Sequence, residues 1–186
     1  MALGLKEVRF HGRGGQGAWT ASLLLAQAAL KEKKYIQSFP AFGPERAGAP
    51  ITAFTRISDN PIHIHSSIYE PDVVVVLDPT LLGPAVTEGV KSETILVVNT
   101  DLSSTNLGTR LGLKDVEIWV VDATTLALNI IGRPITNTVM LGATVKATGL
   151  VNLESLMQVT KQRFTGRIQG PNIEVVQKAY EEVVKG

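Results

Sequence analysis

The sequence predicts one α/β domain in which helices cover a mostly parallel β-sheet, with a helical C-terminal third. Three continuous apolar runs indicate strands buried on both faces, as in a parallel sheet between layers of helices: residues 73–77, 95–98 and 118–121. Helical patterns dominate after the third run. No linker or internal repeat divides the chain, so we expect residues 1–186 to form a single domain.

The first part of the chain alternates short β-branched segments with turn residues. Residues 18–30 are rich in Ala and Leu and lack Gly and Pro, which predicts a helix that is apolar on nearly every face. A loop broken by three prolines is expected over residues 39–50. Strands are expected at residues 7–10, 35–39, 51–57 and 62–65, the last two paired around a turn at residues 59–61.

Four helices are expected in the last third. The first two span residues 124–131 and 138–148, and Gly149 is a favoured residue just after a helix end. Asn152 can cap the third helix, and Pro171 suits the first position of the fourth. Together with the apolar runs, these helices complete the layered α/β domain.

Composition excludes several classes of function. A net charge of +1 gives no general attraction for nucleic acid or anionic lipid. The chain has no cysteine, which excludes disulfides and cysteine-ligated iron–sulfur clusters within it. No apolar run approaches the roughly 20 residues of a membrane span, and the N-terminus does not resemble a signal peptide. We therefore expect a cytoplasmic protein that binds neither nucleic acid nor membrane.

A glycine-rich turn is the strongest local motif. Gly12, Arg13, Gly14, Gly15, Gln16 and Gly17 satisfy G-x-G-x-x-G between a predicted strand and a predicted helix. Small residues let a ligand approach the backbone, and free N–H groups at a helix start attract an anion. Arg13 adds a positive charge. We therefore treat these six residues as candidates for binding a cofactor or another anionic group.

The motif is typical of Rossmann-like dinucleotide sites, but this chain lacks one of their parts. Such sites use an acidic residue about 20 residues further on to bind the ribose. Residues 35–40 contain no carboxylate, which disfavours a dinucleotide. Two interpretations stay open: the glycines only allow the strand and helix to pack closely, or an anionic group or a partner's backbone docks at the helix start.

Other polar residues are weaker candidates. Asp78, Asn99 and Asp122 end the three apolar runs, where α/β sheets bind ligands, but ordinary helix capping is the better explanation for the two aspartates. His63 and His65 share one face of an expected strand without a third metal ligand. His11 has no evident nucleophile beside it. We therefore predict neither a catalytic residue nor a metal site in this chain.

The glycine turn is one of several blocks in which the chain resembles the gamma subunit of 2-oxoacid:ferredoxin oxidoreductases. The resemblance covers roughly the first 150 residues, and its later blocks include Leu77-Asp78-Pro79 and Ile135-Thr136-Asn137-Thr138. Because the blocks follow the family's order, together they are far more specific than one glycine motif. The remaining blocks are residues 8–17, 39–50 and 68–72.

The resemblance implies a role inside a larger enzyme. These enzymes convert a 2-oxoacid and coenzyme A to acyl-CoA and carbon dioxide and pass the electrons to ferredoxin. Thiamine diphosphate, magnesium and the iron–sulfur clusters are expected in partner subunits (alpha, beta and delta). Coenzyme A is expected as a co-substrate near this chain. Pyruvate is the expected 2-oxoacid, which would make the complex a pyruvate synthase and this chain a positioning subunit.

The proline-broken loop is the expected contact with a partner subunit. Phe42, Gly43, Glu45 and Arg46 are the candidates, since a loop this stiff is more than a linker. Many relatives carry a second arginine where this chain has Ala47. The alternative to a dependent subunit is a stand-alone, Rossmann-type nucleotide-binding oxidoreductase, which the missing ribose carboxylate disfavours.

Overall fold

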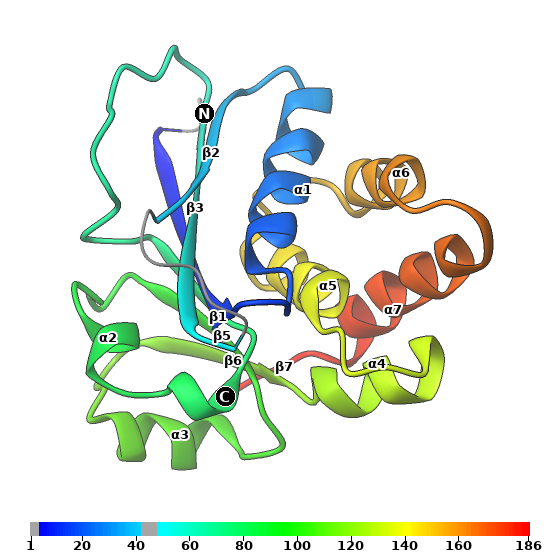
Figure 1. The fold of residues 1–186 in the computed structure, drawn as a ribbon. Coiled ribbons are helices and arrows are strands. Elements are labelled where there is room, and N and C mark those ends of the chain that lie inside the picture. The colour runs from blue at the N-terminus through cyan, green and yellow to red at the C-terminus, as the bar shows by residue number, and fades with distance from the viewer. Residues whose placement is uncertain (1–3, 42–47) are drawn as a thin grey trace.

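The computed structural model describes residues 4–41 and 48–186, which form a layered α/β domain (Figure 1). Its centre is a seven-stranded sheet in the order β2-β3-β1-β4-β5-β6-β7. The strands are β1 (Lys6–Arg13), β2 (Tyr35–Pro40), β3 (Pro50–Ser58), β4 (Val73–Val76), β5 (Ile95–Asn99), β6 (Glu117–Val121) and β7 (Val184–Lys185).

The sheet is mixed, with a parallel centre. β1, β4, β5 and β6 run parallel as neighbours, which confirms the prediction for the three apolar runs. β3 is antiparallel to both β1 and β2, and β7 is antiparallel to β6. The antiparallel strands therefore lie on the two flanks of the sheet, where burial on both faces is less complete.

Helices cover the two faces of the sheet unequally. Figure 1 shows α1, α5, α6 and α7 on one face and α2 and α3 on the other. Within the described residues, no helix combines the length and apolarity that a bilayer crossing requires. The helices are α1 (Ala18–Lys31), α2 (Pro84–Thr87), α3 (Ser104–Leu111), α4 (Ala123–Ile131), α5 (Asn137–Thr148), α6 (Leu153–Arg163) and α7 (Gln169–Glu182).

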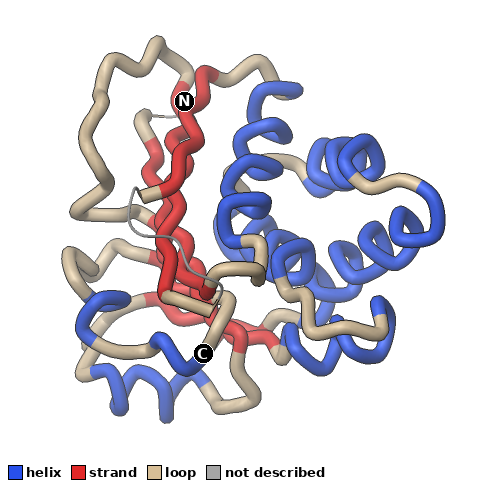
Figure 2. Tube along the Cα trace, in the orientation of Figure 1, coloured by secondary structure: helices blue, strands red, loops and turns tan. Residues whose placement is uncertain are grey.

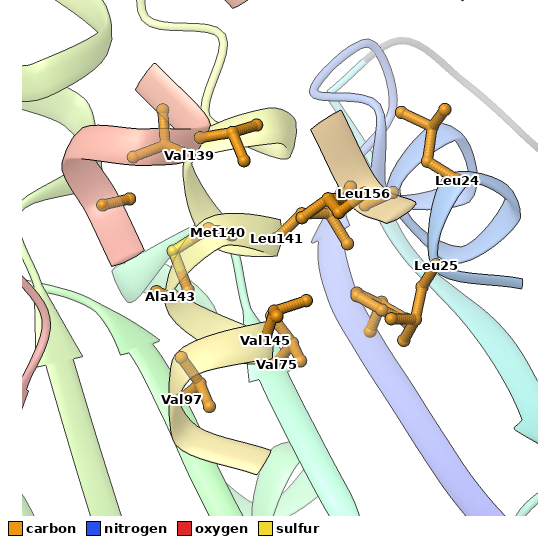
Figure 3. Close-up of a cluster of buried hydrophobic side chains, with 14 of the residues drawn as sticks. Leu24, Leu25, Val75, Val97, Val139, Met140, Leu141, Ala143, Val145 and Leu156 are labelled. Atoms are coloured by element: carbon orange, nitrogen blue, oxygen red, sulfur yellow. The ribbon is translucent and has the colours of Figure 1, made fainter. Parts of the chain in front are cut away.

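The main core lies between the sheet and the larger helical layer. Val75 and Val97 of the sheet lie beside Val145 of α5 in Figure 3, and Leu24 of α1 belongs to the same core. The alternate residues of the same strands, such as Val74, belong to a smaller core under α2 and α3. The parallel strands are thus apolar on both faces, which is why they read as continuous runs in the sequence.

A long loop, rather than a helix, covers the second face of β1 and β3. This segment, the crossover loop (residues 59–72), is drawn in tan in Figure 2 on the side of the sheet away from α1. Arg56 of β3 is 1% exposed and holds the loop, donating to the carbonyl oxygen of Ser66 at 2.8 Å. It also pairs with Glu7 of β1, with 2.7 Å between Nε and Oε1.

The predicted strand at residues 62–65 is wrong. The segment lies in the crossover loop, so His63 and His65 do not share a strand face. Both edges of β3 are already hydrogen-bonded, to β1 and to β2, so no edge is left for another strand. The carbonyl oxygen of Ile64 instead accepts a bond from the Arg56 guanidinium. The buried Arg56 guanidinium, and not a neighbouring strand, is therefore the hydrogen-bond partner of the Ile64 carbonyl.

Other differences from the sequence prediction are small. β1 continues through Gly12 to Arg13, so the turn proper begins at Gly14. α7 begins at Gln169, two residues before Pro171. α2, α3 and β7 were not predicted, because each is short. Asn152 occupies the expected position before α6 but makes no side-chain capping bond there.

Candidate functional site at the ends of β1 and β4

The glycine turn lies at a topological switch point of the sheet. After β1 the chain continues to β2 and β3 on one side, whereas after β4 it continues to β5 on the other. Ligands of open α/β sheets bind outside the carboxyl ends of the strands where the direction of winding reverses. The glycine turn follows β1 and Asp78 follows β4, so the fold brings together two motifs that are distant in sequence.

A polar network joins the glycine turn to Asp78. Gln16 donates from Nε2 to Asp78 Oδ2 at 2.7 Å and accepts from the Arg13 amide at 2.7 Å. Arg13 Nε lies 3.3 Å from Asp78 Oδ2, and Arg13 Nη2 donates to Thr80 at 2.8 Å. The side chains of Arg13 and Gln16 therefore fold back onto the protein, and the charge of Arg13 is largely balanced by Asp78.

The environment of Asp78 keeps this carboxyl group ionised. Burial raises its pKa, but hydrogen bonds from Thr80 and Gln16 and the charge of Arg13 outweigh burial and leave the pKa below its usual value. Asp78 also caps a short 3-10 helix (Pro79–Leu81) by accepting from the Thr80 amide at 2.9 Å. Asp78 is thus a structural anchor for the turn, as the capping interpretation predicted.

Two of the glycines allow close packing around the turn. A Cβ on Gly12 would lie 3.1 Å from the Cβ of Ala18 at the start of α1. Gly17 has φ +80°, and a Cβ there would lie 2.5 Å from Nδ2 of Asn137 at the start of α5. These contacts favour the packing interpretation at Gly12 and Gly17. They also place the Thr136-Asn137 block of the family resemblance against the glycine turn.

The central part of the turn is less closely packed by the described residues. Gly15 has φ +96°, and a Cβ added there would have no described atom within 4 Å. The Gly14 amide is bonded to the carbonyl oxygen of Ala49. No acidic residue occupies the first turn of α1, whose first amides point out of the helix without intrahelical partners. The helix start next to Gly15 therefore has donors that suit an anion, and no acidic side chain of α1 opposes one there.

The other candidates from the sequence have structural roles. Asp122 caps α4 by accepting from the Thr125 amide at 2.9 Å. Asn99 donates to the carbonyl oxygen of Leu77 at 2.8 Å and so ties β5 to the end of β4. Among the residues that the structure describes, no three His, Asp or Glu side chains come together as a metal-binding group. Phe42, Gly43, Glu45, Arg46 and Ala47 lie outside the described residues.

The sequence did not reveal that Arg9 and His11 are buried polar neighbours on the second face of β1. Arg9 and His11 lie beneath the crossover loop and line a cavity of about 250 Å³. Burial, and next the charge of Arg9, lower the pKa of His11 to about 4. The alternation Glu7-Val8-Arg9-Phe10-His11 could have identified this face, because side chains two apart on a strand point to the same side.

Comparisons with known proteins agree with the resemblance seen in the sequence. A family model described as pyruvate ferredoxin/flavodoxin oxidoreductase matches residues 7–182. The common gamma subunit of the pyruvate/ketoisovalerate oxidoreductases of Pyrococcus furiosus is 55% identical over 177 residues, 95% of this chain and 96% of the relative. The Methanothermobacter thermautotrophicus pyruvate synthase subunit PorC is 48% identical over 180 residues, 96% of each chain.

Solved structures resemble the fold over its whole length. The pyruvate oxidoreductase subunit PORC of Thermotoga maritima superimposes with a TM-score of 0.89 at 43% identity, covering 99% of both chains. The 2-oxoglutarate:ferredoxin oxidoreductase of Magnetococcus marinus, solved with coenzyme A bound, matches with a TM-score of 0.77 at 17% identity, over 96% of this chain and 31% of its own. The latter likeness concerns the fold alone.

These matches do not favour the alternative of a stand-alone nucleotide-binding oxidoreductase, because the relatives matched over nearly their full length are named as subunits. They confirm the gamma-subunit prediction made from the ordered sequence blocks. The chain belongs to the pyruvate ferredoxin/flavodoxin oxidoreductase family, and its relatives are gamma subunits of these enzymes.

Proposed function

We propose that this chain is the gamma subunit of a thiamine-diphosphate-dependent, coenzyme A-acylating 2-oxoacid:ferredoxin oxidoreductase, with pyruvate as the first candidate substrate. The observation that carries the proposal is the near full-length match to relatives named as gamma or PorC subunits of pyruvate-oxidising enzymes. Alpha, beta and delta subunits would complete the enzyme, and ferredoxin would accept its electrons.

The chain's own residues suit positioning rather than chemistry. The sequence has no cysteine, so iron–sulfur clusters held by thiolates belong to a partner. The described residues offer no three-ligand group for the magnesium ion that accompanies thiamine diphosphate. Within the proposed enzyme, thiamine diphosphate supplies the carbanion chemistry. This subunit would hold coenzyme A and partner surfaces in place.

The glycine turn is the proposed contact for coenzyme A. No described atom lies within 4 Å of a Cβ added at Gly15, and the first amides of α1 offer donors without an acidic side chain in that turn, which suits a phosphate group. Gly14, Gly12 and Gly17 shape the turn, and Arg13 and Gln16 fix it to Asp78 and Thr80. Phe42, Gly43, Glu45 and Arg46 are proposed to meet a partner subunit.

Co-purification tests the proposed assembly. A tagged chain, expressed in cells that also contain the partner subunits, is expected to elute in a complex well above its own mass of 20.0 kDa. Native mass spectrometry, thiamine analysis and iron analysis of that complex measure its composition. Recovery of the chain alone, with full 2-oxoacid oxidation by that single chain, would contradict the proposal. Binding of NAD or flavin by the isolated chain would favour the stand-alone alternative.

A charge placed at Gly15 tests the coenzyme A contact. Gly15→Asp and Gly15→Asn share the same strained φ and nearly the same size, so they differ mainly in charge. In the assembled enzyme, Gly15→Asp is expected to raise the KM for coenzyme A by about tenfold relative to Gly15→Asn, since a nearby negative charge repels phosphate. The KM for the 2-oxoacid is the internal control. Equal KM values for coenzyme A in the two variants would remove Gly15 from the site.

A further inference from the structure

The starts of two long helices meet beside the glycine turn. Gly17 precedes α1, and Asn137 is the first residue of α5. A Cβ on Gly17 would lie 2.5 Å from Nδ2 of Asn137 and 3.1 Å from its Cγ, so the two residues are in contact. Figure 1 shows α5 passing beside the first turn of α1. The fold therefore places the positive ends of two helix dipoles next to each other.

Both helix starts offer backbone donors. The first bonds within these helices run from the Ala21 amide to the Gly17 carbonyl oxygen, at 2.9 Å, and from the Met140 amide to the Thr136 carbonyl oxygen, at 2.8 Å. The amides that precede Ala21 and Met140 have no acceptor inside their own helix. No acidic residue occupies the first turn of either helix. The two starts together therefore favour an anion.

The side chain of Asn137 has an unused donor at this point. Asn137 is 5% exposed, and its Oδ1 accepts from the Thr138 amide at 2.8 Å. That bond identifies the other end of the amide group as nitrogen. It is also the one side-chain hydrogen bond that Asn137 makes with the described part of the chain. Because buried N–H groups nearly always have an acceptor, the free Nδ2 indicates one that a ligand supplies.

A ligand can reach this nitrogen. Nδ2 points at Gly17, which is half-buried, and Gly15 on the same turn is exposed. The described side-chain nitrogens that are both unpaired and fully covered are Arg9 Nε and His11 Nε2, on the other face of β1. Asn137 Nδ2 does not share that complete cover. Gly17 also has no side chain that could stand between Nδ2 and the turn.

The arrangement of the donors selects a phosphate group. Amides of α1 and Nδ2 of Asn137 come from separate elements and approach from different directions. A tetrahedral phosphate presents oxygens in several directions, whereas a carboxylate presents two in one plane. The Asp78 carboxylate at the edge of this region is balanced by Arg13, with 3.3 Å between Oδ2 and Nε. The helix starts and not a free cation therefore provide the attraction.

We propose that Asn137 is a second contact for coenzyme A at the glycine turn, with its Nδ2 donating to an oxygen of a phosphate group between the starts of α1 and α5. The proposal rests on the proposed function for coenzyme A as the source of that phosphate. It also gives a reason for glycine at position 17, since a Cβ there would displace the Asn137 amide group.

Substitutions of Asn137 in the assembled enzyme test the contact. Asn137→Asp keeps the size of the side chain and an acceptor for the Thr138 amide, but replaces the free donor with a charged oxygen. It is expected to raise the KM for coenzyme A at least about tenfold and to leave the KM for the 2-oxoacid unchanged. Asn137→Ala removes the donor without adding charge, so a smaller rise of about three- to tenfold is expected.

The same change at another helix start is the control. Asn152 precedes α6 and is exposed, and its backbone amide bonds to Glu32 at the far end of α1. Asn152→Asp adds an equal charge away from the glycine turn and is expected to leave both KM values unchanged. A KM for coenzyme A that is the same in Asn137→Asp and Asn152→Asp would overturn the proposal.

Inorganic diphosphate is the probe in the isolated full-length chain. NMR follows the side-chain amide signal of Asn137, which is assigned through its backbone neighbours and needs no variant. Millimolar diphosphate is expected to move this signal and the Gly17 amide signal, and to leave the side-chain signal of Asn152 in place. Sodium chloride of equal ionic strength is expected to move none of them. A shift at Asn137 no larger than at Asn152 would count against the contact.

The two experiments separate this proposal from the proposed function. If Gly15→Asp raises the KM for coenzyme A and neither Asn137 variant does, the proposed function stands and the role of Asn137 is refuted. If the chain joins no complex, the proposed function fails, while the diphosphate titration still decides whether Asn137 contacts phosphate. If neither variant folds, the titration of the unaltered chain gives the answer.

Discussion

Replacing Arg56 with methionine is expected to lower the free energy of unfolding by about 3–5 kcal/mol, the usual cost of removing one partner of a buried ion pair. The Arg56 guanidinium is almost fully buried and pairs with Glu7, while it also donates to the carbonyl oxygens of Ile64 and Ser66. Methionine leaves the Glu7 carboxylate and these carbonyls without their donor. Urea unfolding followed by circular dichroism measures the effect.

An exposed ion pair provides the control for Arg56. Lys91 Nζ and Glu70 Oε2 lie 2.6 Å apart with more than half of each side chain exposed, and solvent screens such pairs so that they contribute little to stability. Lys91→Met is therefore expected to change the free energy of unfolding little. Similar losses in the two methionine variants would show that Arg56 does not anchor the crossover loop. Increased proteolysis of residues 59–72 in Arg56→Met would show directly that the anchor is lost.

Replacing Gly142 with alanine is expected to destabilise the protein by about 1–3 kcal/mol, although alanine is the better helix former. Gly142 lies inside α5, where that helix packs against α7. An added Cβ would overlap the carbonyl oxygen of Val176 and lie 3.0 Å from its carbonyl carbon. Because these are backbone atoms, the helices must move apart. A lower unfolding midpoint in thermal denaturation is the expected observation.

Gly170 of α7 is the matched control for Gly142. It lies in the first turn of its helix and has no atom within 4 Å of an added Cβ. Gly170→Ala is therefore expected to leave the unfolding midpoint unchanged or to raise it slightly, by up to about 0.5–1 kcal/mol in stability. A loss of stability in Gly170→Ala as large as in Gly142→Ala would mean that the α5–α7 contact is not the cause.

Elements whose signals are local could be predicted from the amino-acid sequence. β4, β5 and β6 are apolar on both faces, so each can be recognised without knowing which strands lie beside it. The Ala- and Leu-rich run of residues 18–30 predicts α1 with an error of one residue at its C-terminal end. The family could also be identified from the sequence, because its characteristic blocks of residues occur in the same order along this chain. The absence of cysteine excluded cysteine-ligated iron–sulfur clusters from this chain in the same way.

Arrangements that depend on distant residues became evident only from the packing of the folded chain. β3 lies between β1 and β2, which left residues 62–65 without a strand to pair with. Arg13 meets Asp78 across 65 residues of chain (78 − 13), so the charge offered to a ligand at the glycine turn is smaller than the sequence implied.

The burial of Arg9 and His11 has the same origin. Nothing in the sequence around these two residues indicates that the crossover loop covers them. A periodic pattern in the sequence predicts which side of a helix or strand is buried, because successive side chains point in directions fixed by the geometry of that element. Which residues pack against that side depends on how the whole chain folds. The net charge at a site depends on the fold for the same reason.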